Sequence, residues 1–209
     1  MRAEPSLRRG QHKINDRSPI AALIWLVAPV PRADAVISLA IVLIVAGAGV
    51  AVGYQAFSPE ADASGPGGLL ETTEFWPVLQ AILSQNLAAA LLAFSGVATA
   101  GLSTLFGISL TSLWVGASFH AVQVELGAAE VVIRVLPYAG IEFAGILLAA
   151  TAGLLPAVVF VAERFRYAPR QRYTYTSSVP GTLRLFLVAV LLITMGALVE
   201  AAVIATAHP

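Results

Sequence analysis

The chain alternates between long apolar runs and short polar segments. Residues 35–57 form the clearest run, which has no charged side chain and exceeds the roughly 20 residues that a helix needs to cross a bilayer. A second run begins at Val78 and is long enough for two spans, so we expect a tight turn near Gly101. The pattern predicts five membrane-spanning helices, at residues 35–57, 79–100, 103–122, 131–162 and 182–206.

The first 34 residues differ from the remainder of the chain. A basic, polar tail leads into an apolar segment that Pro19 and Pro29 bracket and that is too short to span a bilayer. Its Trp25 favours a short interfacial helix, because tryptophan anchors segments at the membrane surface. We therefore divide the chain into residues 1–34, a cytoplasmic tail with an interfacial helix, and residues 35–209, a single transmembrane domain.

Two polar connections lie within the transmembrane domain. Residues 58–77 carry four acidic side chains and no lysine or arginine, and residues 123–130 join the third and fourth predicted spans. The fourth span is longer than a bilayer requires. Pro137 near its start and Pro156 near its end are each expected to kink or break it, since proline lacks the N–H that a helix uses.

Composition agrees with this division. Hydrophobic residues make up 58% of the 209 residues and charged residues only 11%, against about 25% charged in soluble domains. The fold class expected is an all-α, polytopic transmembrane helical bundle. The chain has no cysteine and no P-loop, HExxH, GxSxG or paired metal-ligand spacing, so we expect neither a cofactor nor a metal site. No feature favours nucleic-acid binding.

Basic residues predict the orientation in the cell membrane. The tail and the segment after the fourth span are positive, whereas residues 58–77 are acidic. Because positive segments remain in the cytoplasm, we expect the N-terminus inside and, after five spans, the C-terminus outside. The basic cytoplasmic loop contains Arg164, Arg166, Arg170 and Arg172.

Four short motifs follow one another in the central tract: Gln85-Asn86, residues 111–116 (TSLWVG), residues 137–143 (PYAGIEF) and residues 149–154 (AATAGL). In their spacing they resemble the stage II sporulation protein M family, also numbered as family of unknown function 95. That family has an Asn pair, N-G-x-x-x-G, P-H-G-x-x-E-L-x-A and a small-residue run. Here Thr111-Ser112 replaces the family's Asn-Gly and Tyr138-Ala139 its His-Gly. The positions that carry over are Asn86, Gly116, Pro137 and Glu142.

The resemblance implies a bacterial membrane protein without a defined activity. The family's namesake is similar to a membrane-anchoring component of the cell-wall-remodelling machinery of sporulation. Other members resemble accessory proteins of transporters or AAA ATPases. Some relatives are associated with the maturation, export or immunity of bacteriocins and other hydrophobic ribosomal peptides.

Ionisable side chains inside a span cost roughly 2.5–3.5 kcal/mol each on insertion scales and usually face the bundle interior. Six such residues are expected in or near the outer half of the membrane: His120, Glu125, Glu130, Arg134, Glu142 and Glu200. Arg134 and Glu130 have the favourable i,i+4 spacing. For Glu142 we expect a partner in Asn86 or Tyr138.

Two functions fit these residues. The first is an integral membrane accessory or scaffold protein for a hydrophobic ribosomal peptide, in which Glu142 stabilises the helix bundle by hydrogen bonding. Its expected partners are membrane lipids, a transporter, an ATPase or the peptide itself, with homo-oligomerisation left open. The alternative is a membrane-embedded enzyme that modifies a hydrophobic peptide, in which Glu142 and His120 act as acid and base, supported by Glu200 or Arg134.

Overall fold

The computed structural model describes residues 32–56, 74–165 and 175–207. Three predictions therefore lie outside the described residues: the interfacial helix, most of the acidic loop, and Arg166, Arg170 and Arg172 of the basic loop. The described residues are almost entirely helical and contain no strand, which confirms the all-α prediction.

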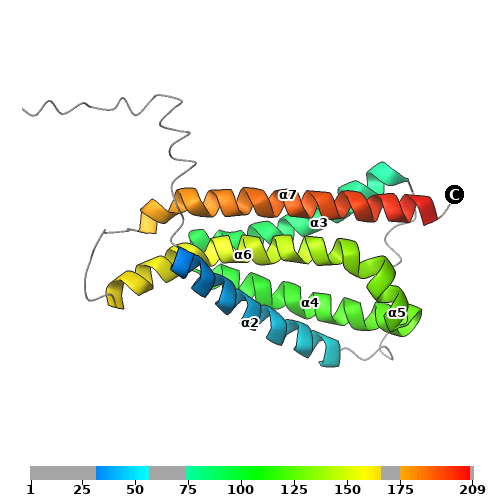
Figure 1. Cartoon of the computed structure of the whole chain (residues 1–209), viewed down its shortest axis with the longest axis horizontal. Helices are drawn as coiled ribbons and strands as arrows, with labels where there is room; N and C mark the ends of the chain where they lie inside the picture. Colours follow the sequence, from blue (N-terminus) through cyan, green and yellow to red (C-terminus); the bar gives the residue numbers. More distant parts are fainter. Residues whose placement is uncertain (1–31, 57–73, 166–174, 208–209) are drawn as a thin grey trace, which may run out of the picture.

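Five long helices run alternately up and down (Figure 1). Each is long and apolar enough to cross a membrane, as predicted. They are α2 (Arg32–Ala56), α3 (Phe75–Phe94), α4 (Leu102–Leu126), α6 (Leu136–Phe165) and α7 (Tyr175–Ala207).

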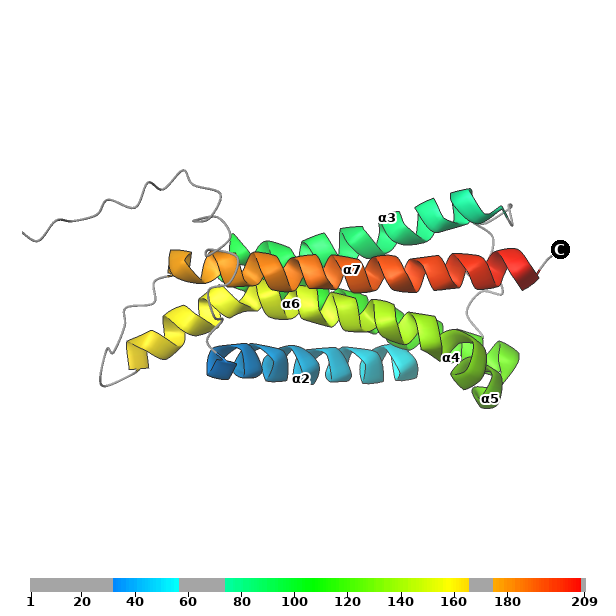
Figure 2. The ribbon, with the colours of Figure 1, turned by 45° about the horizontal axis from the view of Figure 1, so that its top comes forward.

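Helix α6 is the centre of the bundle. In its most apolar stretch 61% of the residues are buried, against 17–28% in the other four helices. In Figure 1, helices α3 and α7 lie on one side of it and α2 and α4 on the other, and the turned view of Figure 2 shows α6 between α7 and α2. Its buried side chains are mostly small, among them Ala149, Ala150 and Gly153. Small side chains let neighbouring backbones approach closely, which is how helices associate where no hydrophobic force acts between them.

Helices α2 and α4 pack through glycines. Gly53 of α2 lies against the backbone of Leu113, and Gly116 of α4 lies against the backbone of Val50 and Tyr54. A Cβ at Gly53 would stand 2.8 Å from the Leu113 carbonyl carbon, well inside an ordinary carbon contact of about 3.5–4.0 Å. The Gly49/Gly53 pair is thus used for packing within the chain.

The turn predicted near Gly101 lies between α3 and α4. A 3₁₀ turn, η2 (Ser95–Val97), is followed by Ala100 at φ 51° and Gly101 at φ 89°. The Thr104 hydroxyl donates to the Ala93 carbonyl at 2.5 Å. The Tyr175 hydroxyl of α7 donates to the Val97 carbonyl, so the uncharged turn is held against protein.

The connection predicted at residues 123–130 is shorter than expected. Helix α4 continues to Leu126, and only Gly127, at φ 84°, interrupts the helical backbone. A short helix, α5 (Ala128–Glu130), and a π-helical segment, η3 (Val131–Val135), then lead into α6. Pro137 has no N–H and would clash with the carbonyl four residues earlier, a reason for the π-helical segment to lie there.

Candidate functional site

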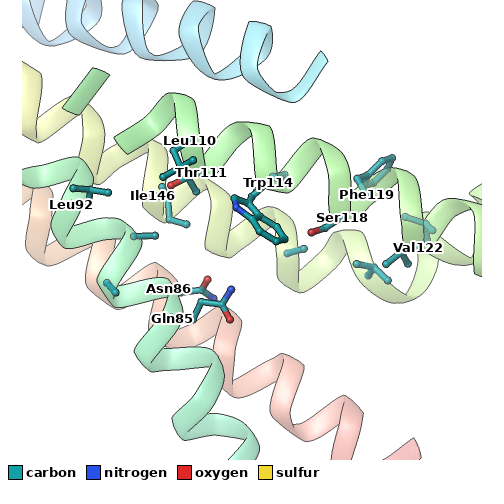
Figure 3. A pocket seen from close by; sticks show the side chains of 16 residues that line it. Gln85, Asn86, Leu92, Leu110, Thr111, Trp114, Ser118, Phe119, Val122 and Ile146 are labelled. Carbon is teal, nitrogen blue, oxygen red and sulfur yellow. The ribbon is translucent and has the colours of Figure 1, made fainter. Parts of the chain in front are cut away.

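A groove of about 530 Å³ lies where α3 and α4 diverge, with η3 and α6 at its base. Its wall is mainly apolar and includes Trp114 and Phe119 of α4 and Ile146 of α6 (Figure 3). Trp114 is 61% exposed, so the groove opens sideways towards the lipid. The volume is within the range of about 300–1,000 Å³ that is typical of ligand pockets.

Two amides project into this groove from α3. Gln85 and Asn86 point into the space opposite Trp114 (Figure 3). Asn86 is the middle residue of the Phe75–Val97 membrane-spanning stretch, because 86 is halfway between 75 and 97. Gln85 is exposed there, at a depth where lipid offers no hydrogen-bond partner. The groove therefore combines an apolar wall with polar groups that an occupant could satisfy.

Behind Asn86 lies a pair of carboxyl groups. The side chains of Glu142 on α6 and Glu200 on α7 are neighbours that interact electrostatically, and the Asn86 side chain lies beside Glu142. Glu142 is 8% exposed, and its Oε1 atom is buried without a hydrogen-bond partner. Gly196 of α7 makes room for this side chain, since a Cβ at that position would collide with the Glu142 Cγ. Tyr138, one turn earlier on α6, is close enough to interact electrostatically with both carboxyls.

No described basic side chain balances this pair. Arg164 is 22 residues from Glu142 along α6, and Arg184 is 16 residues from Glu200 along α7, which correspond to about 33 Å and 24 Å. Arg134 forms an ion pair with Glu130, its Nε lying 2.5 Å from Oε2, as predicted. Within the described part of the chain, the carboxyl pair has an amide and a phenol nearby but no cation.

His120 belongs to a different helix interface. Its Nδ1 lies 2.7 Å from the Tyr54 carbonyl oxygen, and its ring is 4.6 Å from the Tyr54 ring. The Tyr54 hydroxyl in turn donates to Gln123 Oε1 at 2.9 Å. His120 thus joins α4 to α2, whereas Glu142 joins α6 to α3 and α7. The structure does not bring together the acid and base of the enzyme hypothesis.

Sequence reasoning found part of this site. The contact between Glu142 and Asn86 was expected and is present. The contact between Glu142 and Glu200 was not expected, although both residues were predicted in the same half of the membrane. Their shared depth was the available signal. The groove and Trp114 were missed, because no sequence pattern reports the angle at which α3 and α4 separate.

Metal binding has no support in the described residues, where no three histidine or acidic side chains are grouped to hold an ion. Comparison with known proteins adds no function: no protein family, curated protein or solved structure matches the chain.

Proposed function

We propose that the chain is an integral membrane accessory protein that holds a hydrophobic peptide segment in the groove between α3 and α4. The observation that carries this proposal is the groove itself, a lipid-facing apolar space of about 530 Å³ with two amides at mid-span. A lipid acyl chain could fill the space but would offer the exposed Gln85 amide no hydrogen-bond partner. A peptide segment brings both apolar side chains and polar groups, so it suits the groove better.

The same proposal covers the biological setting that the family resemblance suggests. A hydrophobic ribosomal peptide in maturation, export or immunity would reach this groove from within the bilayer. We place the N-terminus in the cytoplasm and the C-terminus outside, because basic residues follow α6 and acidic residues precede α3. An ATPase or transporter would meet the protein at the cytoplasmic Arg164 end. The chemistry needed is binding, which requires no acid–base pair.

Photo-crosslinking tests this proposal directly. The chain has no cysteine, so single cysteines can carry a benzophenone label at chosen sites. Ser118→Cys lies in the groove, and Leu191→Cys lies on an exposed part of α7 as the control. The probe is a synthetic leucine–alanine helix with one central asparagine, in lipid nanodiscs. We expect crosslinking from position 118 and only background from position 191.

A filling substitution provides the second arm of the test. Ala88→Trp places a large side chain in the groove, whereas Ala202→Trp makes the same change on an exposed part of α7 outside it. Crosslinking from position 118 should be lost with Ala88→Trp and kept with Ala202→Trp. Equal crosslinking from the two labelled positions, or equal effects of the two tryptophans, would refute peptide binding in the groove.

A further inference from the structure

The carboxyl pair beside the groove has no basic side chain next to it among the described residues. Two neighbouring carboxyl groups away from water favour a state in which at least one of them is protonated, because two ionised carboxylates there would repel each other strongly. One oxygen of the pair, Glu142 Oε1, has no hydrogen-bond partner although it is buried. Buried polar atoms are nearly always satisfied, so this atom indicates a partner that binds there.

We propose that the groove selects hydrophobic peptides that carry one basic side chain, and that Glu142 and Glu200 bind its cation. This inference rests on the proposed function, because it assumes that a peptide occupies the groove. Asn86 connects the two features, since it lines the groove and lies beside Glu142. A lysine side chain is long enough to keep its stem along the apolar wall while its ammonium group reaches past Asn86.

The charge of the site favours a cation over other polar groups. The pair presents four carboxyl oxygens, and the described residues supply only the Asn86 amide and the Tyr138 hydroxyl nearby. An ammonium group would donate to Oε1, and its positive charge would favour release of a proton from the pair to water. A neutral amide would satisfy that atom without favouring this release. A carboxylate would be repelled by both glutamates.

The position of Glu142 next to the groove indicates a binding site in addition to a contact between helices. Gly196 leaves the space that the Glu142 side chain occupies between α6 and α7. Residues on either side of Glu142 on α6, Ala139 and Ile146, line the groove. The carboxyl group is therefore one side chain away from the groove occupant.

Binding of two matched peptides tests the inference. The probes are a leucine–alanine helix with one central lysine and the same helix with acetyl-lysine, which keeps the length and removes the charge. Affinities are measured by fluorescence for the full chain in nanodiscs. We expect the lysine peptide to bind roughly ten- to a hundredfold more tightly, the range given by a hydrogen bond to a charged group.

Substitutions and a change of pH identify the side chains that bind the ammonium group of the peptide. Glu142→Gln with Glu200→Gln should abolish the preference, whereas Glu125→Gln, an exposed carboxyl at the end of α4, should keep it. Lowering the pH should weaken binding of the lysine peptide alone, because protons compete for the same oxygens. The titratable groups that face the pair are Tyr138 and the two glutamates themselves. This pH measurement needs no variant, so it remains informative if the double variant fails to fold.

The outcomes separate the two proposals. Equal affinity for the two peptides, or a preference that survives the double substitution or the change of pH, overturns the cation site and leaves the groove proposal intact. If neither peptide binds and the asparagine helix does not crosslink, both proposals are wrong.

Discussion

The packing of α2 on α4 allows one prediction in which a single type of substitution has opposite effects. Gly47 and Gly53 both lie in α2, six residues apart. A Cβ at Gly47 would meet nothing within 4 Å, whereas a Cβ at Gly53 would collide with the backbone of Leu113. The Gly53 site cannot relax by rotating a side chain, because the atoms it meets are main-chain atoms. Gly53→Ala must therefore move α2 away from α4.

The magnitude follows from the geometry. The Leu113 carbonyl carbon would be 2.8 Å from the new Cβ and the Leu113 carbonyl oxygen nearer still, so the helices must separate by at least about 1 Å to reach ordinary contact. A gap of that size forfeits a quarter to a half of each dispersion contact, and overpacking typically costs about 1–3 kcal/mol. Gly53→Ala should lower the free energy of unfolding by that amount. Gly47→Ala should leave it unchanged or raise it by up to about 1 kcal/mol, because alanine is the better helix former.

Unfolding in mixed micelles of increasing dodecyl sulfate content measures both variants. Helix content from circular dichroism and tryptophan fluorescence, to which Trp114 on α4 contributes, report the transition. Two results would refute the reasoning: equal stability of the two variants, or a larger loss for Gly47→Ala. Either would mean that α2 does not contact α4 through Gly53.

Three further substitutions test other contacts. Gly196→Ala should lower the free energy of unfolding by about 1–3 kcal/mol, because the new Cβ would collide with the Glu142 side chain. The loss should be smaller in a Glu142→Ala background, and a double-mutant cycle by the same unfolding assay should give a coupling of about 1 kcal/mol. His120→Ala should lower the free energy of unfolding by about 0.5–1.5 kcal/mol, because the hydrogen bond between α2 and α4 is lost. Crosslinking in the groove should be unchanged, and its loss would contradict the separation of the His120 interface from the groove. Arg134→Ala should change stability by less than about 0.5 kcal/mol, because Arg134 and Glu130 are 71% and 46% exposed; a larger loss would contradict a solvated pair.

The helices were predictable because the bilayer imposes their length. A helix must be apolar over about 20 residues to cross it, and runs of that length are visible in the sequence. The turn at Gly101 was also visible, since small and flexible residues interrupt a run that is too long for one span. The break at Gly127 was placed less well. Gln123, Glu125 and Glu130 suggested a polar connection over residues 123–130, but helix α4 continues to Leu126.

Which helix faces touch was much harder to predict. In a soluble helix the apolar face marks the core, but in a membrane both faces are apolar, so the pattern does not report direction. His120 bonds to a residue 66 positions away in the sequence, and nothing in the local pattern names Tyr54 as its partner. The groove depends in addition on the angle between α3 and α4, which is a property of the whole bundle.

Polar residues carry the directional information that apolar residues lack. A carboxyl group within a span is costly, so it must find a partner at its own depth. Glu200 is the only acidic or basic residue in the second half of α7, and Glu142 the only one in α6 between Pro137 and Pro156. Both were predicted in the same half of the membrane, which leaves few alternatives once α6 and α7 are known to be neighbours. Rare polar residues that lie at the same depth in the membrane therefore predict contacts between spans, which hydrophobic periodicity cannot do. In this chain, the contact that this rule identifies is the carboxyl pair of Glu142 and Glu200.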